Sequence, residues 1–424
     1  MPGPSLLSDE LVRHLIAVGQ VDVLVGVPTF NNASTVARVV KAVHVGFAKH
    51  FPRARTLLIN SDGGSQDGTV DAVRGAALDE SETVIARHAL RTMHRISAPY
   101  HGLPGKRTAL RTLFTAAELL QAKAVAVLDP DVASVTPDWI GALIQPVLRE
   151  QFDFVAPVYA RQCFEAPLAT QLVRPLFGAA FGARVREPIG GEFGCSGRFV
   201  TRALQQNLWD NDLARPTMEM WLLAAARLSD FQVCQAHLGP RVLAGGRPRP
   251  ALAELILQVV GSLFACLDAN ASHWLARTEV VDVPTFGQPV PVADEEPGFE
   301  VEPMIEAFQN GVRDLDPILA QILTPGTLEG VHQAAAAGDG LDIPDALWAA
   351  AVIEFAASYH RATLNREHLL QALVPIYLGR VAAYVHRHVS NPRPAFEQSL
   401  DALCREYENS RRYLIERWNT EGGR

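Results

Sequence analysis

Short apolar runs alternate with amphipathic segments through the first third of the chain, and this pattern restricts the fold more than any other feature. Runs rich in β-branched or small apolar residues predict strands at 21–27, 57–60 and 124–128. We expect the first strand to stop at Pro28, and a helix to begin after Ser34 or Thr35, either of which can cap it. Strands that alternate with helices are typical of an α/β protein with an open sheet, which binds ligands at the carboxyl ends of its strands.

The second half of the chain predicts a helical domain. Pro, Glu and Asp break the periodicity over residues 286–303, which indicates a linker. Beyond it, apolar residues recur at three- and four-residue spacing over 342–359, 367–388 and 395–418. We therefore predict an α/β domain over 1–285, a linker over 286–303 and an all-helical C-terminal domain over 304–424.

The charge balance argues against a nucleic-acid partner. The sequence has 38 Lys+Arg against 46 Asp+Glu, a formal net charge of -8, whereas binding to a phosphate backbone needs a concentrated basic surface. A small anion needs only a local basic pocket, so the charge balance does not exclude small anionic ligands. The N-terminus has no basic and apolar leader, and no apolar run reaches the ~18 residues of a membrane span. The five cysteines form no CxxC pair, and we expect a cytoplasmic protein with reduced thiols and no membrane span.

Acidic and glycine residues follow the second and third predicted strands. Asp129-Pro130-Asp131 places two carboxylates at the sheet edge, where Mg²⁺ or Mn²⁺ bound to a diphosphate could bridge them. In Asp62-Gly63-Gly64-Ser65 the glycines permit close backbone approach, and Asp62 can accept a hydrogen bond from a base or a ribose hydroxyl. Both segments are also open to a purely structural interpretation, as turns that end a strand or cap a helix.

Lys106 is a candidate phosphate contact. The chain has only four lysines among its 38 basic residues, and this one follows Gly105 in a loop at the start of a predicted helix. The alternative is a solvated surface lysine.

The order of these segments along the chain resembles the nucleotide-sugar glycosyltransferases of the GT-A fold. The resemblance runs from about Val21 to Leu267 and rests on Val-Pro-Thr-Phe-Asn-Asn, Asp-Gly-Gly-Ser, Pro-Gly-Lys and Asp-Pro-Asp. Pro188–Cys195 and Thr170–Leu176 further resemble segments of the retaining enzymes glucosyl-3-phosphoglycerate synthase and mannosylglycerate synthase. The helical tail, with Trp348-Ala349-Ala350 and Tyr359, looks more like mannosylglycerate synthase. The fold class that this implies is α/β, an open mixed GT-A sheet flanked by helices and followed by an all-helical C-terminal domain.

The resemblance also implies roles for residues that bind the donor. It places the nucleotide base and ribose against Pro28, Asn31 and Asp62, and the diphosphate against Gly64 and Lys106. Asp129 would contact the ribose and the metal, and Asp131 would be the principal metal ligand. The donor sugar hydroxyls would meet Gly190, Gly191 and Glu192, with Glu192 orienting them.

The acceptor residues and the catalytic set follow from the same resemblance. Thr170 matches a position near the acceptor, and Glu219 falls where the family has an acidic residue near the acceptor hydroxyl. Glu219 can also be read as a carboxylate favoured at a helix N-terminus. Arg161 or Arg174 could hold an acceptor carboxylate. The predicted catalytic residues are Glu192, Glu219 and Lys106.

The chain departs from the family pattern in two places. The segment 238–246 lacks the metal-binding histidine that the family has there, and His237 lies just before it. Four interpretations stay open: the metal is held by Asp131, diphosphate and water; Arg241 partly replaces its charge; metal dependence is lost; or His237 is a displaced ligand. Residues 164–169 lack the arginine that helps hold the acceptor phosphate, which favours an unphosphorylated acid such as glycerate.

The resemblance thus implies a retaining hexosyltransferase of compatible-solute biosynthesis. The donor would be a UDP- or GDP-hexose with glucose or mannose, the acceptor a small hydroxy acid such as D-glycerate, and the cofactor Mg²⁺ or Mn²⁺. We expect front-face attack in which a donor phosphate oxygen takes the acceptor proton, and the family's helical region allows a homodimer. The alternatives are a catalytically silent binding relative and a transferase for a phosphorylated or glycan acceptor. A dehydrogenase is disfavoured, because no Gly-x-Gly-x-x-Gly follows the first strand.

Overall fold

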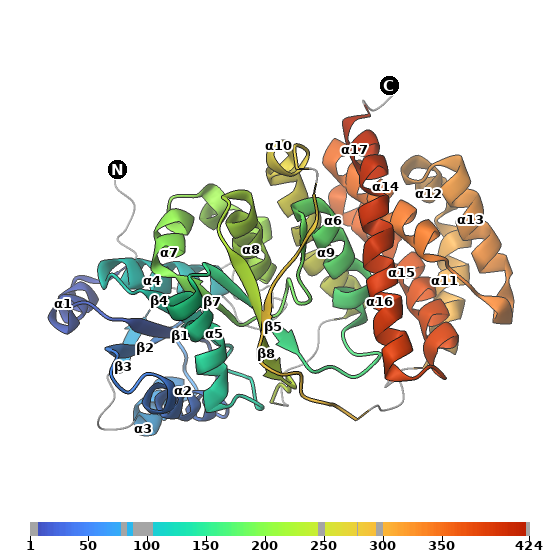
Figure 1. Ribbon diagram of the computed structural model, residues 1–424. Helices are drawn as coiled ribbons and strands as arrows, with labels where there is room; N and C mark the ends of the chain where they lie inside the picture. The colour runs from blue at the N-terminus through green and yellow to red at the C-terminus, as the bar shows by residue number, and fades with distance from the viewer. Residues whose placement is uncertain are drawn as a thin grey trace. The chain divides into compact units, whose positions relative to one another are not determined.

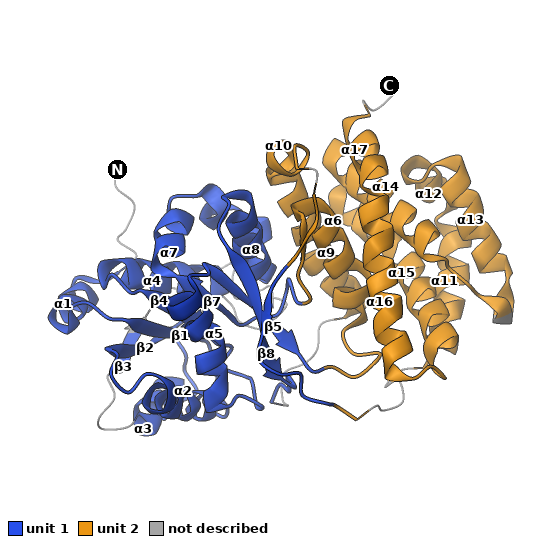
Figure 2. Ribbon diagram, in the orientation of Figure 1, with its two compact units in different colours: residues 1–160, 187–249, 283–291 blue, residues 161–186, 250–282, 292–424 orange. Residues whose placement is uncertain are grey.

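The chain divides into two compact units (Figure 2). The computed structural model describes residues 7–77, 83–87, 105–244, 251–277, 279–293 and 300–420. Unit 1 comprises residues 1–160, 187–249 and 283–291, and unit 2 comprises residues 161–186, 250–282 and 292–424.

Unit 1 is built on an eight-stranded mixed sheet in the order β10-β8-β5-β7-β4-β1-β2-β3 (Figure 1). Its strands are β1 (Val23–Thr29), β2 (Thr56–Asp62), β3 (Thr83–Arg87), β4 (Ala124–Val127), β5 (Phe154–Tyr159), β7 (Phe193–Ser196), β8 (Val233–Gly239) and β10 (Thr285–Phe286). All neighbouring pairs are parallel except those of β7, which runs antiparallel to both β4 and β5. The predicted fold class, an open mixed α/β sheet, is confirmed.

The first strand continues through Pro28, so the predicted stop at that residue is wrong. β1 pairs with β2 as far as Thr29, while its pairing with β4 ends at Gly26. The Gly26 carbonyl accepts from Leu128 N, so the backbone groups of Gly26 point towards β4. The backbone groups of residue 28, two positions further on, point to the same side, but there β4 has already ended. The missing N–H of Pro28 therefore breaks no ladder hydrogen bond.

Helices cover both faces of this sheet (Figure 1). On one face lie α2 (Val36–His50), α3 (Thr69–Ala76) and α5 (Pro137–Glu150), and on the other α4 (Lys106–Leu119), α7 (Gly197–Leu204) and α8 (Met218–Leu228). Helix α1 (Asp9–Val18) packs on α4, and the short 3-10 turns η3 (Asn207–Asp210) and η4 (Asp212–Thr217) lead into α8. Gly194 lets α5 approach β7 closely, because a Cβ there would lie 2.1 Å from the Leu143 carbonyl oxygen.

Unit 2 is helical, which confirms the predicted helical C-terminal region. Its elements are η2 (Ala169–Val173, a π-helix), α6 (Arg174–Phe181), β6 (Ala183–Arg184), α9 (Leu252–Ala269), α10 (Ala271–Trp274), β9 (Val281–Asp282), α11 (Glu302–Asp314), α12 (Asp316–Ile322), α13 (Pro325–Ala336), η5 (Gly338–Gly340), α14 (Asp345–Arg361), α15 (Arg366–His388), α16 (Arg393–Asn409) and α17 (Arg411–Asn419). The predicted helix over 395–418 is two helices, because the chain breaks at Ser410 between α16 and α17.

This division differs from the linear one expected from the sequence. Residues 161–186 and 250–282 belong to unit 2, although the sequence analysis placed both in the domain over 1–285. The reason is packing, since α6 contacts α16 and α9 contacts α15. The expectation that 1–285 and 304–424 are the folding domains stays a prediction.

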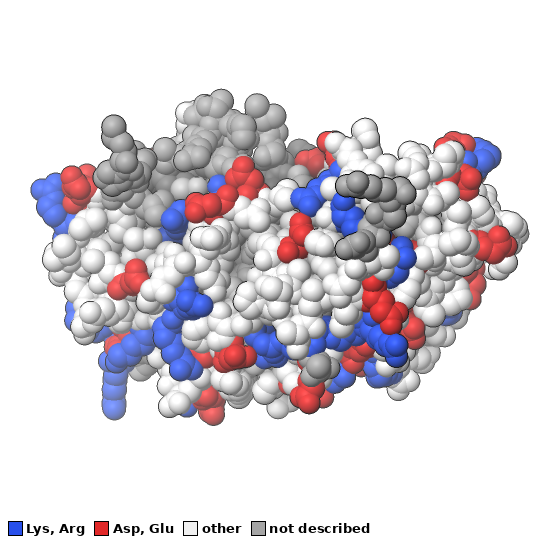
Figure 3. Space-filling view, turned by 90° about the horizontal axis from the view of Figure 1, so that it is seen from above, with Lys and Arg blue, Asp and Glu red and all other residues white. Residues whose placement is uncertain are grey.

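Helices α9 and α15 are long and apolar enough to cross a membrane by length and composition alone. Their most apolar windows are 56% and 78% buried inside the protein, as in core helices. The expected absence of a membrane span stays a prediction. On the face shown in Figure 3, acidic and basic side chains alternate over the described surface.

Candidate functional site

The ends of the parallel strands of unit 1 carry most of the predicted donor-binding residues. Thr29 ends β1, Asp62 ends β2 and is its register partner, and Asp129 follows β4 by two residues. Because parallel strands end at one edge of a sheet, these side chains gather at its carboxyl edge. β7 runs the other way, and its first residue, Phe193, pairs with Val127, so Glu192 also lies at that edge.

Asp62 organises the loop after β2. Its carboxylate is fully buried and accepts from Thr29 Oγ1 at 2.9 Å, Ser65 Oγ at 2.6 Å, Gly64 N at 3.0 Å and Ser65 N at 2.9 Å. Gly64 has φ of 86°, a conformation that favours glycine, and an added Cβ would meet nothing within 4 Å. The loop is thus a turn held by Asp62, and the predicted contact of Asp62 with a base or ribose stays a prediction.

Asp131 ties the loop after β4 to the loop after β1. Its Oδ1 accepts from Asn32 Nδ2 and from Thr35 Oγ1, both at 2.7 Å. Thr35 is the N-cap residue of α2, but its hydroxyl accepts no capping hydrogen bond; it donates to Asp131 Oδ1 and lies 3.2 Å from the Asn32 carbonyl oxygen. Asn31 lies in the same loop at φ of 56°, and its Oδ1 accepts from Gln66 N.

Arg241 joins the ends of three strands. It follows β8 by two residues, and its side chain is only 9% exposed. Its Nε donates to Glu192 Oε2 at 3.0 Å, and its Nη2 lies 3.2 Å from Glu192 Oε1 and 3.3 Å from Asp129 Oδ2. Tyr159, the last residue of β5, donates its hydroxyl to Glu192 and lies 3.0 Å from the Gly190 carbonyl. The Arg241 guanidinium stands 5.7 Å from the centre of the Tyr159 ring.

Protonation in this cluster follows from burial and charge. Burial and the charge of Glu192 raise the pKa of Tyr159 well above its usual value, so its hydroxyl stays protonated and remains a donor. Burial by itself would lower the pKa of Arg241, but neighbouring negative charge, first that of Glu192, outweighs it and the pKa rises. Arg241 is therefore a permanent cation between two carboxylates.

The carboxylates at this edge do not fit a preformed site for a divalent metal. Both Asp129 oxygens have protein partners, Asp131 N at 2.9 Å and Arg241 Nη2, while Asp131 Oδ1 is occupied by Asn32 and Thr35. Among the described residues, no three His, Cys, Asp or Glu side chains gather closely enough to hold a metal ion. His237 lies inside β8, paired with Val158, and joins no such group in that part of the chain.

Lys106 and Glu219 form a buried ion pair. Lys106 Nζ lies 2.8 Å from Glu219 Oε2, and the two side chains are 5% and 3% exposed. Lys106 begins α4 after Gly105, and Glu219 lies in the first turn of α8. Both helices run back from the carboxyl edge of the sheet, so their N-termini lie there. The surface interpretation of Lys106 is therefore wrong, and Glu219 is both a first-turn carboxylate and the partner of a buried cation.

The glycines before Glu192 serve packing and conformation. A Cβ on Gly190 would lie 2.3 Å from Pro157 Cγ, and Gly191 has φ of 93°. The predicted contacts of Gly190, Gly191 and Pro28 with the donor stay predictions. Of the Gly102–Lys106 segment, only Gly105 and Lys106 lie within the described residues.

The three predicted acceptor residues belong to unit 2. Arg161 pairs with Glu165 at 2.8 Å, and Arg174 pairs with Asp401 at 2.8 Å. Thr170 lies in the π-helix, with its hydroxyl 3.5 Å from the Ala166 carbonyl. Their role towards an acceptor stays a prediction.

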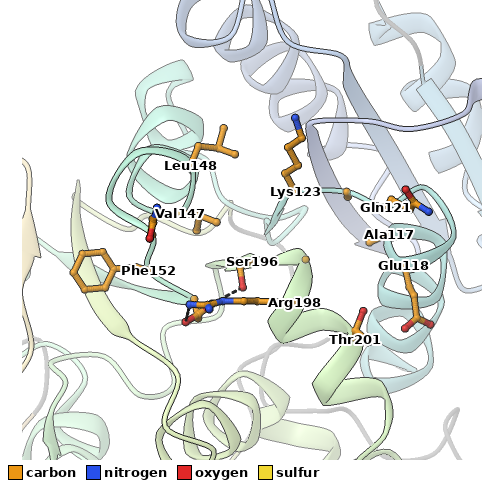
Figure 4. Close-up of a pocket in the computed structure, with 14 residues that line it drawn as sticks. Ala117, Glu118, Gln121, Lys123, Val147, Leu148, Phe152, Ser196, Arg198 and Thr201 are labelled. Atoms are coloured by element: carbon orange, nitrogen blue, oxygen red, sulfur yellow. Dashed lines mark hydrogen bonds and ion pairs between the residues drawn. The ribbon is translucent and has the colours of Figure 1, made fainter.

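A pocket of about 600 Å³ lies at the opposite, amino-terminal edge of the sheet. Figure 4 shows Arg198 beside Ser196 in this pocket. Arg198 and Ser196 both donate to Asp153, a carboxylate that also accepts from Gln232 N. These polar groups satisfy one another and tie the starts of β5 and β8 to the end of β7, which is a structural role.

Sequence reasoning did not assign Tyr159, Asn32 or Thr35 to the site: it named Thr35 only as a possible helix cap, and it treated Arg241 only as one substitute for a metal. Tyr159 ends an apolar strand, so the reasoning applied to Asp62 and Asp129 would have found it. Asn32 and Thr35 carry a weaker signal, because polar residues after a strand are common in turns. Asn32 and Thr35 donate hydrogen bonds to Asp131, and Tyr159 donates one to Glu192. Each of these hydrogen bonds joins segments that are far apart in sequence.

No family model matches this chain, and no curated protein matches it. Among solved structures it is similar to glucosyl-3-phosphoglycerate synthase from Mycobacterium tuberculosis with Mn²⁺, uridine diphosphate and glucosyl-3-phosphoglycerate, at 22% identity over 63% of this chain and 85% of that one, with a TM-score of 0.41. The same enzyme with Mg²⁺ and uridine diphosphate matches at 22% identity over 63% and 84%, with a TM-score of 0.40. The enzyme with Mn²⁺, UDP-glucose and phosphoglyceric acid matches at 21% over 63% and 85%, with a TM-score of 0.41. Similarities this low assign no role to any residue of this chain.

Proposed function

We propose that this protein is a hexosyltransferase whose donor, a nucleotide-diphosphate sugar, binds at the carboxyl edge of the unit 1 sheet. The observation that carries the proposal is the convergence there of Asp62, Asp129, Glu192 and the buried Lys106–Glu219 pair. Open α/β sheets bind ligands at this edge, and buried charged groups, which are costly to remove from water, cluster at functional sites. The acceptor would be a small acidic molecule such as D-glycerate, and the donor a UDP- or GDP-hexose.

The described carboxylates of this edge argue against an enzyme nucleophile, so a transfer that retains the anomeric configuration would have to proceed without one. Glu192 is held by Arg241 and Tyr159, Glu219 by Lys106, and Asp62 by its own loop. A carboxylate fixed by several donors is a poor nucleophile and a good positioning group. We therefore favour attack on the front face, in which Glu192 orients the sugar and the departing diphosphate accepts the acceptor proton. Bond cleavage would then depend on positioning and on electrostatic stabilisation.

A protein that binds the donor without turnover is the second candidate. The absence of a metal-binding group among the described residues favours it, because the departing diphosphate must have its charge stabilised. The two candidates bind the same ligand and differ only in catalysis.

Binding and transfer assays with a donor panel would separate these functions. UDP- and GDP-linked glucose and mannose are each combined with D-glycerate or 3-phosphoglycerate, in Mg²⁺, Mn²⁺ or EDTA. We expect one donor and one acid to give a product that retains the anomeric configuration, identified by NMR. Binding with no product from any acid would favour the silent candidate, and no binding of any donor would refute both.

Asp62→Asn is expected to weaken donor binding without unfolding the protein. Gly64 N and Ser65 N donate to Oδ2, whereas Thr29 Oγ1 and Ser65 Oγ donate to Oδ1. The amide keeps the volume but has only one acceptor oxygen, so one of these two pairs of donors loses its acceptor. We expect at least about a tenfold rise in donor Kd by calorimetry, because a misplaced loop loses about 1.4 kcal/mol of binding or more. Asp71→Asn is the control, since Asp71 is 84% exposed on α3. Equal donor affinities for the two variants would contradict a role for this loop.

A further inference from the structure

Arg241 is buried where a cation is needed. Glu192 and Asp129 are 1% and 9% exposed, and both face the same guanidinium. Two neighbouring carboxylates removed from water repel one another, and each loses its hydration. One cation placed between them offsets both the repulsion and the lost hydration. In unit 1 the guanidinium of Arg241 is that cation.

The arrangement uses the shape of arginine. Nε and Nη2 approach the two oxygens of Glu192, and Nη2 also faces Asp129. Two-point contact fixes the carboxylate in position and orientation, which a lysine ammonium cannot do. Tyr159, protonated as argued above, holds Glu192 from a further direction. Glu192 is thus held by groups from the ends of β5 and β8.

A divalent ion cannot bind to these two carboxylates at the same time as the guanidinium. It would need their oxygens, which already accept from Arg241, and it would stand beside a permanent positive charge. We infer that Arg241 takes the place of a resident divalent metal between Asp129 and Glu192, and that it positions Glu192 for the donor sugar. Only the second half of this inference rests on the proposed function.

Binding of Mn²⁺ to the nucleotide-free protein tests the first half. The EPR signal of free Mn²⁺ is followed during titration into wild-type protein, R241Q, R241H and R241K. We expect the wild type and R241K to leave the signal unchanged, because a cation still lies between the carboxylates. R241Q and R241H remove the guanidinium from both carboxylates, and we expect each to bind one Mn²⁺ at least about tenfold more tightly than the wild type.

Arg198→Gln is the matched control. It removes an arginine that also donates two hydrogen bonds to a buried carboxylate, but among the described ion pairs Arg198 contacts only that one carboxylate, Asp153. We expect this variant to gain no Mn²⁺ site. Circular dichroism of every variant identifies any that fails to fold, and the wild-type titration stands without them.

Stoichiometric Mn²⁺ binding by the wild type would overturn the inference, as would a folded R241Q that gains no site. Neither result depends on sugar transfer, so failure of the proposed function leaves this test intact.

Kinetics test the second half of the inference, that Arg241 positions Glu192. We expect R241K to lower kcat about tenfold while the donor KM stays within about twofold, since positioning and not affinity is lost. A change confined to KM would refute the positioning role.

Discussion

Glu219→Leu is expected to lower the free energy of unfolding by about 3–5 kcal/mol, because it leaves the Lys106 ammonium buried without its partner. Lys106→Met should cost a similar amount by leaving the Glu219 carboxylate unpaired. The double variant replaces both charges with apolar side chains and should recover most of the loss, since an apolar pair of similar volume is often as stable as a buried ion pair. The measurement is urea unfolding of all four proteins, analysed as a double-mutant cycle.

Lys49 and Asp138 provide the control pair. They also form an ion pair, with 2.6 Å between Lys49 Nζ and Asp138 Oδ1, but their side chains are 54% and 63% exposed. Water screens such a pair, so Lys49→Met and Asp138→Leu should each change stability by less than about 1 kcal/mol. If the Lys106 and Glu219 variants changed stability no more than the Lys49 and Asp138 variants, the Lys106–Glu219 pair would not behave as a buried ion pair.

The same double variant separates stability from function. If the pair serves only to hold α4 and α8 together, a stable double variant keeps its transferase activity. Under the proposed function it should lose transfer by on the order of 100-fold, because two charged groups next to the reacting atoms are gone. Full activity in a stable double variant would remove Lys106 and Glu219 from the catalytic set.

Two carboxylates of the site were predictable because each lies at the end of a strand: Asp62 is the last residue of β2, and Asp129 follows β4 by two residues. Asp62 and Asp129 were found this way, and the register of β1, β2 and β4 brings them to one edge. Their partners were not predictable in the same way. Lys106 and Glu219 are 113 positions apart, and Arg241 and Asp129 are 112 apart, so neither pairing leaves a local pattern in the sequence.

The bounds of the helices were predicted better than their division between the two units. Apolar spacing locates α14 and α15 within a few residues, because each helix needs only its own sequence to show one apolar face. Which helices pack together depends on contacts between distant segments, and spacing does not encode these. The single predicted helix at 395–418 fails for a related reason: both halves continue the apolar spacing across Ser410, where the structure separates α16 from α17.

Arg411 shows how three separate segments become one unit, and its loss should destabilise unit 2 strongly. It begins α17 and is 8% exposed, and its guanidinium donates to the carbonyls of Ala179, Ala180, Trp274 and Arg277. The first two lie near the end of α6, and the others lie in and after α10. The last carbonyls of a helix lack partners within the helix, so one arginine satisfies two helix ends that would otherwise be buried without donors.

Arg411→Met keeps the length of the side chain but removes every one of these donors. We expect it to lower the free energy of unfolding of unit 2 by about 3–5 kcal/mol, the effect of several buried acceptors left unsatisfied. Arg412→Met is the control, because the neighbouring side chain is 90% exposed and pairs with Glu416 on its own helix. Hydrogen exchange followed by mass spectrometry should then show faster exchange in α6, α10 and α17 together in the Arg411 variant. Faster exchange confined to α17 would mean that other contacts, such as the Arg174–Asp401 and Arg366–Asp268 ion pairs and apolar packing, hold 161–186 and 250–282 in unit 2 without Arg411.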